Sequence, residues 1–255
     1  MEIQITNPNQ MNNLEVILKA EIDSAISTAK MYPRSITTFL QRAESIATLS
    51  AEIAESCTFK VPRQGKTIEG KSVRFAEILV SQYQNIKCGA RIVANDGKTI
   101  TAQGVCHDLE NNVSVSFEVK KTITKKDGST YSEDMQVVAG NAACAIAFRN
   151  AVFKVIPSAI SDSIHDKVKK VAMGTVETLP ARRKKSIEYL ASKGVTEQQI
   201  IEVLNIKKIN DIDLDILQEL RGICVSIETG ECTAKEIFEK PEKKLDQLFE
   251  NTPKG

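Results

Sequence analysis

Residues that bind metals or form disulfides are sparse in this sequence of 255 residues. It has only two histidines, His107 and His165, and none of its six cysteines forms a C-x-x-C pair. Structural zinc sites and disulfide frameworks both need partners at regular spacings, so neither is expected here. The cysteines stand mostly among apolar residues, where a reduced cysteine behaves as a small hydrophobic side chain. We therefore expect a core role and no catalytic use for Cys57, Cys88, Cys106, Cys144, Cys224 and Cys232.

Long apolar segments are also missing. No run approaches the roughly 20 residues that a membrane-spanning helix needs. The first ten residues, MEIQITNPNQ, lack the positively charged and then apolar order of a secretory signal. These two absences predict a cytoplasmic protein without a membrane partner.

Nucleotide-dependent and metal-dependent chemistry finds little support in the sequence. There is no phosphate-binding G-x-x-x-x-G-K-[ST] loop, because Gly65-Lys66-Thr67 lacks the upstream glycine. One cluster, His107-Asp108-Leu109-Glu110, offers an imidazole and two carboxylates that could hold a divalent metal as nucleases do. Without a second acidic motif, such a cluster is more typical of a turn. We expect no enzyme activity, no catalytic residue, no metal and no cofactor.

Positive charge is concentrated in the middle of the chain. The formal net charge is only +1, yet residues 61–179 hold 16 lysines and arginines against 12 aspartates and glutamates. The counts are 5 against 7 before this region and 13 against 14 after it. A positive excess this small gives useful affinity for nucleic acid only if the charges line a focused groove or if many subunits act together. The sequence therefore predicts an oligomer if the ligand is nucleic acid.

Three strands joined by tight turns are predicted between residues 86 and 130. Apolar and polar residues alternate along 86–93 and again along 113–120, as on strands with one buried and one solvated face. Asparagine and glycine tolerate the positive φ of tight hairpins, which marks three turns: Asn95-Asp96-Gly97, Glu110-Asn111-Asn112 and Lys126-Asp127-Gly128. The resulting sheet is expected to have one basic, solvated face.

One long helix is predicted to cover the apolar face of this sheet. Its segment, DMQVVAGNAACAIAFRNAVFKVIP, ends at Pro157, which cannot donate a backbone hydrogen bond. Small residues near its middle would let the helix approach the sheet closely. Helical spacing predicts an inner stripe of Met135, Val138, Ala142, Ile146, Phe153 and Ile156. Arg149 and Lys154 are expected on the late, exposed half.

Further helices are predicted before the sheet, over residues 14–31, 35–49, 50–57 and 72–83. Between the last two, the segment FKVPRQGKTIEG reads as a loop. Its basic residues Lys60, Arg63 and Lys66 could grip a single-stranded backbone while Phe59 stacks on a base. The alternative is a solvated basic loop with Phe59 tucked into the core.

A compact helical module is predicted over residues 180–240. Gly194 suits the left-handed position after its first helix, and capping boxes start at Thr196 and Thr233. Three short helices of this kind offer a groove to a peptide, or serve only as a stabilising cap. The module begins with a basic stretch: Arg182, Arg183, Lys184 and Lys185. This stretch favours an acidic peptide or a phosphate as partner, or it is a solvated face.

These elements together predict an α+β fold, with a β-β-β-α core, N-terminal helices and a small C-terminal three-helix domain. Residues 1–179 are expected to bind the ligand and to oligomerise, and residues 180–240 to bind a partner. Residues 241–255 are charged and lack apolar periodicity, so a flexible tail is expected there.

Four stretches of the sequence resemble phage single-strand annealing proteins of the RecT and Redβ type. They are TAKMYPRSI, PRQGKTIEGKSVRFAEI, GNAACAIAFRNAVFKVIP and GVTEQQIIEVLNIKKINDIDLDILQELRGICVSIETGE. The resemblance implies a ring or filament that holds single-stranded DNA in a basic groove along the assembly. It also implies annealing of complementary strands without nucleotide hydrolysis, for phage DNA recombination and repair in the bacterial cytoplasm. The protein partners that it implies are a host single-stranded-DNA-binding protein, met through its acidic tail, and a phage exonuclease.

The DNA-contacting residues follow from this resemblance and from charge. Arg149 and Lys154 match basic positions that the resemblance places against the strand. The others are assigned from charge and alternation alone: Lys87, Arg91, Lys120 and Lys121 on the sheet, Arg63 and Lys66 on the loop, and Arg74 on the following helix. Two alternatives stay open. One is a single-stranded-DNA-binding protein that does not anneal, and the other is a phage adaptor or structural protein whose helical module binds a peptide.

Overall fold

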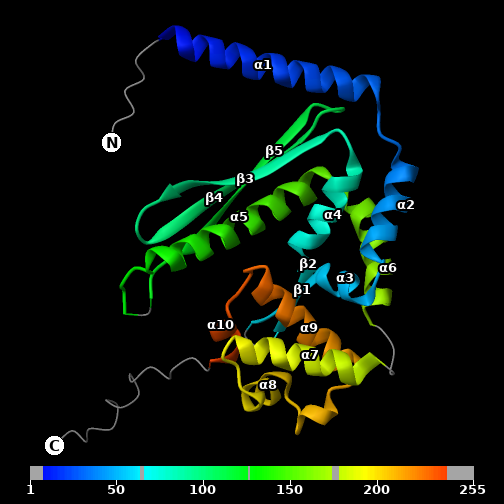
Figure 1. Ribbon diagram of the computed structural model, residues 1–255, viewed down its shortest axis with the longest axis vertical. Helices are drawn as coiled ribbons and strands as arrows, with labels where there is room; N and C mark the ends of the chain where they lie inside the picture. The colour runs from blue at the N-terminus through cyan, green and yellow to red at the C-terminus, as the bar shows by residue number, and fades with distance from the viewer. Residues whose placement is uncertain (1–7, 64–65, 126, 174–177, 240–255) are drawn as a thin grey trace, which may run out of the picture.

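The computed structural model has a mixed α+β fold, which confirms the predicted fold class. It describes residues 8–63, 66–125, 127–173 and 178–239. A three-stranded antiparallel sheet is flanked by helices, and the C-terminal helices gather at the far end of the molecule from the first helix (Figure 1). The predicted tail at 241–255 lies outside the described residues, as does Lys126 of the third predicted turn.

The central sheet has the strand order β3-β4-β5. Its strands are Ile86–Asn95 (β3), Thr99–Asp108 (β4) and Val113–Thr122 (β5). Gly97, Asn112 and Gly128 have φ angles of 78°, 52° and 82°, which are the left-handed values that tight turns require. The predicted strands and turns are therefore confirmed, apart from a register shift between Ile92 and Ala94 near the end of β3.

Helix α5, Glu133–Val155, packs along one face of this sheet. Gly104 of β4 lies so close to α5 that a Cβ atom there would overlap the carbonyl group of Ala147. The same atom would lie 2.7 Å from the backbone nitrogen of Phe148. Ala143 and Ala147 are fully buried at this contact. The small residues of α5 thus allow the close approach that the sequence predicts.

The predicted inner stripe of α5 is wrong at its start. Met135 and Val138 are 47% and 59% exposed, whereas Ala142 and Ile156 are buried as expected. Small residues occupy the inner positions, because the close approach leaves no room for larger side chains. The residues buried along this helix include Ala139, Gly140, Ala143, Ala147 and Ala151.

Helices α1 to α4 precede the sheet, as the sequence predicts. Their bounds are Pro8–Met31 (α1), Ile36–Ala47 (α2), Ala51–Ser56 (α3) and Val73–Tyr83 (α4). Ser35, Ser50 and Ser72 cap the last three, since each hydroxyl accepts a hydrogen bond from the backbone N–H three residues further on. Helix α1 begins six residues before the predicted start at residue 14.

The segment predicted to be a loop between α3 and α4 is a β-hairpin. Its strands Thr58–Arg63 (β1) and Lys66–Lys71 (β2) pair in antiparallel register. Helix α9, Leu214–Glu228, packs on β1, where the Ser226 hydroxyl donates to the Lys60 carbonyl at 2.7 Å. The loop prediction is wrong because this hairpin is stabilised by a helix distant in sequence.

Helix α6, Ser158–Ala172, packs with α2, α3 and the end of α5 around the largest apolar core. His165 of α6 is only 5% exposed, and its Nε2 lies 2.8 Å from the Thr58 hydroxyl. Burial, together with the charges of the nearby Lys169 and Lys71, lowers the pKa of His165 to about 4. The folded protein therefore holds this imidazole neutral at physiological pH.

Lowering the pH from about 7 to about 5 is expected to cost about 2 kcal/mol of stability through His165 alone. The unfolded histidine binds a proton near pH 6.5, whereas the folded one stays neutral until about pH 4. The stability is therefore complete above the unfolded pKa and is lost as the pH falls toward the folded one. Urea unfolding of the wild type and of His165→Gln at both pH values measures the difference. The same pH dependence in both proteins would contradict the neutral buried imidazole.

The C-terminal helices surround a separate apolar core, which includes Leu190, Ile200, Leu217, Leu220 and Ile223. Besides α9, they are Leu179–Ser192 (α7), Glu197–Leu204 (α8) and Ala234–Phe238 (α10), with a short 3-10 turn at Ile209–Asp211. Both predicted capping boxes are present. Gly194 has the predicted left-handed conformation, with φ at 81°. The domain boundary between residues 179 and 180 stays a prediction.

No single helix in the described ranges is both long enough and apolar enough to cross a membrane. Helices α5 and α6 reach the required length and composition only as a pair, and that pair is bent by 117°. Much of α5 is buried against the sheet and the core of the protein.

Candidate nucleic-acid interface

The face of the central sheet opposite α5, here called the open face, has no helix packed along it among the described residues. Side chains alternate along a strand, and residues paired across two strands share a face. Lys87, Arg91 and Lys120 therefore project from the open face, and all three are exposed. Their partners across β4 are His107, Gln103 and Thr101. The predicted basic, solvated face is present.

The three cations of the open face have no ion-pair partner in the described part of the chain. Arg91 donates a long hydrogen bond to the amide oxygen of Gln103, at 3.5 Å. Glu118 stands on the same face, opposite Gln103 on β5, but forms no ion pair with a described residue. Unpaired, solvated cations attract anionic ligands such as phosphates without first losing an internal partner. The open face is therefore suited to a phosphate backbone.

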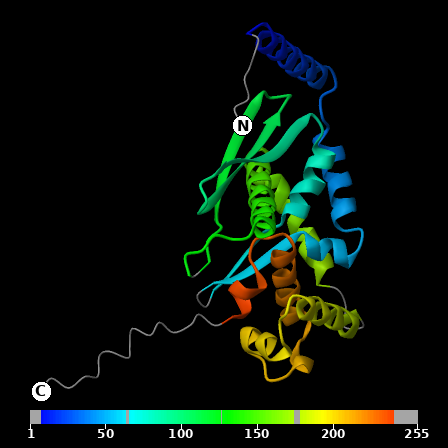
Figure 2. The same ribbon diagram turned by 60° about the vertical axis from the view of Figure 1, so that its left-hand side comes forward.

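Helix α1 extends from the body of the molecule on the side of the sheet opposite α5 (Figure 1). It stands clear of the strands over most of its length (Figure 2). Its last turns are fastened, since Ala29 is 1% exposed and the Asn85 amide donates to the Tyr32 carbonyl at 2.8 Å. Farther along the same helical stripe, Leu18 and Ile22 are 49% and 42% exposed. The part of this apolar stripe that includes Leu18 and Ile22 has no apolar partner among the described residues.

Arg149 and Lys121 do not lie on the open face, and the prediction that Arg149 is exposed is wrong. Arg149 is 8% exposed, forms an ion pair with Glu231 and lies 4.7 Å above the Phe59 ring. Burial lowers its pKa to about 10, so the guanidinium keeps its charge at neutral pH. Lys121 donates to the Gly230 carbonyl at 2.6 Å, and burial lowers its pKa as well. Both cations hold the turn that follows α9.

The remaining predicted DNA contacts are scattered. Lys154 is exposed near the end of α5, and Lys66 is exposed at the start of β2. Arg74 of α4 is exposed and pairs with Glu77 at 3.0 Å. Arg63 ends β1, and its side chain lies outside the part that the structure describes. Of all the predicted contacts, the structure gathers only the three on the open face.

The carboxylates of the acidic cluster at the end of β4 bind the side chain of Arg34. Arg34 Nη1 lies 2.9 Å from an oxygen of Asp108, and Arg34 Nε lies 3.0 Å from an oxygen of Glu110. Burial is the largest single influence and raises the pKa of Asp108, but the hydrogen bonds from Arg34 and Asn111 and the charge of Arg34 together leave this pKa below its usual value. His107 projects from the other face, 3.1 Å from Asn112. Both carboxylates are thus engaged in tying the start of α2 to the sheet.

The basic start of α7 is partly engaged inside the chain. Arg182 pairs with the buried Glu55 of α3, and Arg183 donates to backbone carbonyls of the 3-10 turn. Only Lys184 and Lys185 are exposed, at 78% and 63%. A partner-binding role for these four residues stays a prediction. The two arginines hold buried or backbone partners, and the exposed lysines pair with Glu188 and Glu52 at the surface.

Gln103 is the open-face residue that the sequence predictions missed. It lies at the centre of the face, between Arg91 on β3 and Glu118 on β5. A signal was available in the sequence, because Ile100, Ala102 and Cys106 alternate along β4 with the polar residues Thr101, Gln103 and His107. An amide at this point can donate to a phosphate oxygen or to a base edge.

Comparison of the chain with models of protein families, with curated proteins and with solved structures finds no match. The resemblance to annealing proteins therefore rests on the sequence stretches given above.

Proposed function

We propose that this chain binds single-stranded DNA on the open face and anneals complementary strands without ATP, as an oligomer, in phage homologous recombination. The observation that supports this most is the set of exposed cations Lys87, Arg91 and Lys120 on one uncovered sheet face. None of them pairs with a described carboxylate. The resemblance to single-strand annealing proteins supports the same assignment.

The open face would hold the backbone of the strand and leave its bases accessible. Lys87 and Arg91 lie four residues apart on β3, which separates them by about 13 Å along the strand. Two cations at this spacing can contact separate phosphates of one strand without reading the sequence. A second strand can then sample complementarity, and a matched duplex becomes stable on the protein.

An oligomer is part of the proposal, because three cations in one subunit give only weak binding. Several subunits on one strand add their contacts and raise the effective affinity. The apolar stripe of α1 that includes Leu18 and Ile22 is a surface on which a second copy could pack, since exposed apolar patches of this kind mark interaction sites. The proposed assembly would place open faces side by side.

The direct test is an annealing assay. Two complementary labelled oligonucleotides are mixed with the full chain in the absence of nucleotide, and duplex formation is followed over time. We expect pairing faster than in buffer alone. Binding without faster pairing would instead support a protein that only covers single strands. If neither binding nor pairing occurs, the adaptor alternative is favoured.

The open-face cations predict a specific change in salt dependence. Replacing Lys87, Arg91 and Lys120 by alanine together should weaken single-strand binding and reduce the slope of log affinity against log salt by about 2. Titrations at several salt concentrations measure this slope. Lys170→Ala removes an exposed lysine of α6 and serves as the control, with binding expected to stay at the wild-type level. An unchanged slope in the triple variant would remove the open face as the DNA site.

A further inference from the structure

Two cysteines face each other across β3 and β4. Cys88 and Cys106 are directly paired in the antiparallel register, and their sulfur atoms lie 2.7 Å apart. Opposite residues on antiparallel strands have Cα atoms about 4.5–5.5 Å apart. A disulfide requires roughly 4.4–6.8 Å between these atoms, so residues paired in this register have a suitable Cα spacing.

The two thiols differ in access and in acidity. Cys88 lies on the edge strand and is half-buried, whereas Cys106 on the central strand is fully buried. The hydrogen bond from Cys106 lowers the pKa of Cys88 in spite of its burial. The same hydrogen bond and burial raise the pKa of Cys106. Cys88 is therefore the thiol that more readily forms a thiolate and meets a solute.

We propose that Cys88 and Cys106 form a reversible oxidation site, at which a peroxide converts the two thiols into a cross-strand disulfide. The Cys88 thiolate attacks one oxygen of hydrogen peroxide, the O–O bond breaks, and the released hydroxide takes up a proton to become water. Cys88 is now a sulfenic acid. The Cys106 sulfur then attacks the Cys88 sulfur, the S–O bond breaks, and the leaving hydroxide takes the Cys106 proton as a second water. Two thiols and one peroxide thus give one disulfide and two waters.

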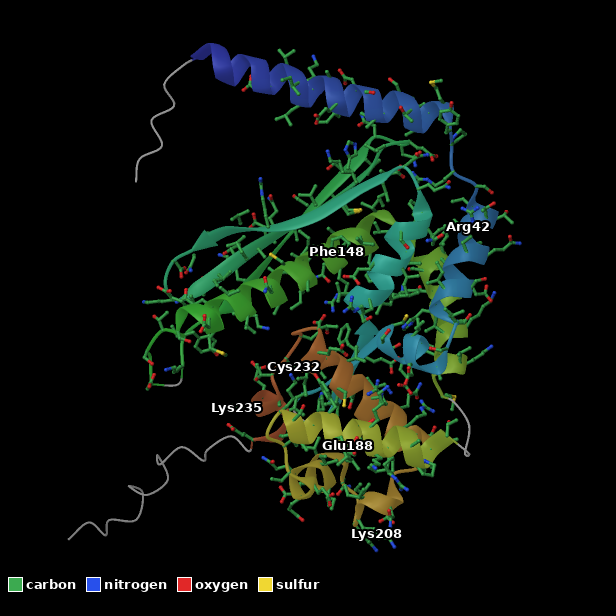
Figure 3. All side chains as sticks on the ribbon, viewed as in Figure 1. Arg42, Phe148, Glu188, Lys208, Cys232 and Lys235 are labelled. Carbon is green, nitrogen blue, oxygen red and sulfur yellow. The ribbon has the colours of Figure 1, made fainter. Side chains whose placement is uncertain are left out.

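The other cysteines lack this arrangement. Burial raises the pKa of Cys57 and of Cys224 to about 12, and it also raises the pKa of Cys144. Cys232 is buried just after α9 (Figure 3). In a reducing compartment, disulfides that do form are usually transient and redox-sensing. The site is independent of the proposed DNA binding, because its residues lie on the face of the sheet turned toward α5.

Peptide mapping of the full chain tests the proposal. The protein is treated with hydrogen peroxide, free thiols are blocked with iodoacetamide under denaturing conditions, and trypsin is added without reductant. Cleavage places Cys88 in the peptide 88–91 and Cys106 in the peptide 99–120, each with a single cysteine. We expect these two peptides joined, the intact chain two hydrogens lighter and still monomeric in mass, and both peptides alkylated again after dithiothreitol.

Matched variants decide between this site and general thiol oxidation. Cys144→Ser should leave the link unchanged, whereas Cys88→Ser should leave Cys106 free to be alkylated after peroxide. The wild-type map does not depend on either variant folding. Cys88 that stays fully alkylatable after peroxide would overturn the proposal. So would Cys88 oxidised to a sulfinic acid beside an alkylated Cys106, or a link formed only between separate chains.

Discussion

Replacing Glu55 by alanine is expected to lower the free energy of unfolding by about 3–5 kcal/mol. Glu55 is 6% exposed, and its two carboxylate oxygens accept hydrogen bonds from different arginines. Arg182 Nε of α7 lies 2.8 Å from one oxygen, and Arg221 Nε of α9 lies 2.7 Å from the other. Alanine would leave two guanidinium groups in a poorly solvated place without their shared anion. Chemical denaturation at neutral pH measures the loss.

Glu52 provides the control on the same helix. It also pairs across to α7, with Lys185 at 2.6 Å, but its side chain is 68% exposed. Water already solvates both groups, so Glu52→Ala should change stability by less than about 1 kcal/mol. Similar small losses at both positions would mean that the Glu55 cluster contributes no more than a surface pair.

Gly104→Ala is expected to destabilise the protein by about 3 kcal/mol or more. The added methyl group would overlap the Ala147 carbonyl group, and it would lie 2.7 Å from the Phe148 nitrogen. These are backbone atoms inside α5, so they cannot move aside as a flexible side chain would. The helix would have to lift from the sheet along its most tightly packed turns. Thermal and urea unfolding measure the loss of stability. If the loss is too large for the variant to be purified, a lower yield of soluble protein reports it.

Gly89→Ala is the matched control in the neighbouring strand. Gly89 pairs with Val105, and a Cβ atom there would meet nothing within 4 Å. Alanine loses less backbone entropy on folding than glycine, which predicts a gain of about 0.5–1 kcal/mol. If Gly104→Ala were tolerated as well as Gly89→Ala, the close approach of α5 to β4 would be wrong.

Short-range signals account for most of what the sequence predicts correctly. The turn Asn-Asp-Gly between β3 and β4 acts within a few residues, so its structural outcome depends little on the rest of the chain. The two capping boxes in the C-terminal helices are of the same kind. The β-β-β-α order follows from these signals and from the alternation along the strands.

Contacts between distant segments account for most of what was missed. Glu55 meets its arginines on α7 and α9, and Arg149 meets Glu231, far along the chain. Read from charge alone, an arginine is assigned to the surface, because burial depends on a partner that no local pattern announces. The β1-β2 hairpin is not predicted from the sequence for a similar reason. Pro62 argues against a strand locally, while the supporting helix α9 lies near the other end of the sequence.

In the candidate site, too, the residues predicted from a local pattern are placed correctly, whereas not all of those predicted from charge alone are. Alternation along β3 was enough to place Lys87 and Arg91 on one solvated face. Lys120 and Lys121 are adjacent, so strand geometry alone sends them to opposite faces. Treating both as DNA contacts was a prediction from charge, and the structure places only Lys120 on the open face.

The packing of α9 on β1 has a consequence for the order in which the protein is made. A ribosome releases the hairpin early, yet the helix that covers it follows only at residues 214–228. The partners of Arg149 and Lys121, Glu231 and Gly230, are likewise synthesised late. During synthesis the hairpin and these two cations therefore remain without their final contacts until nearly the whole chain has emerged. The newly made chain passes through a long interval in which its earliest hairpin is open to chaperones and to unwanted association.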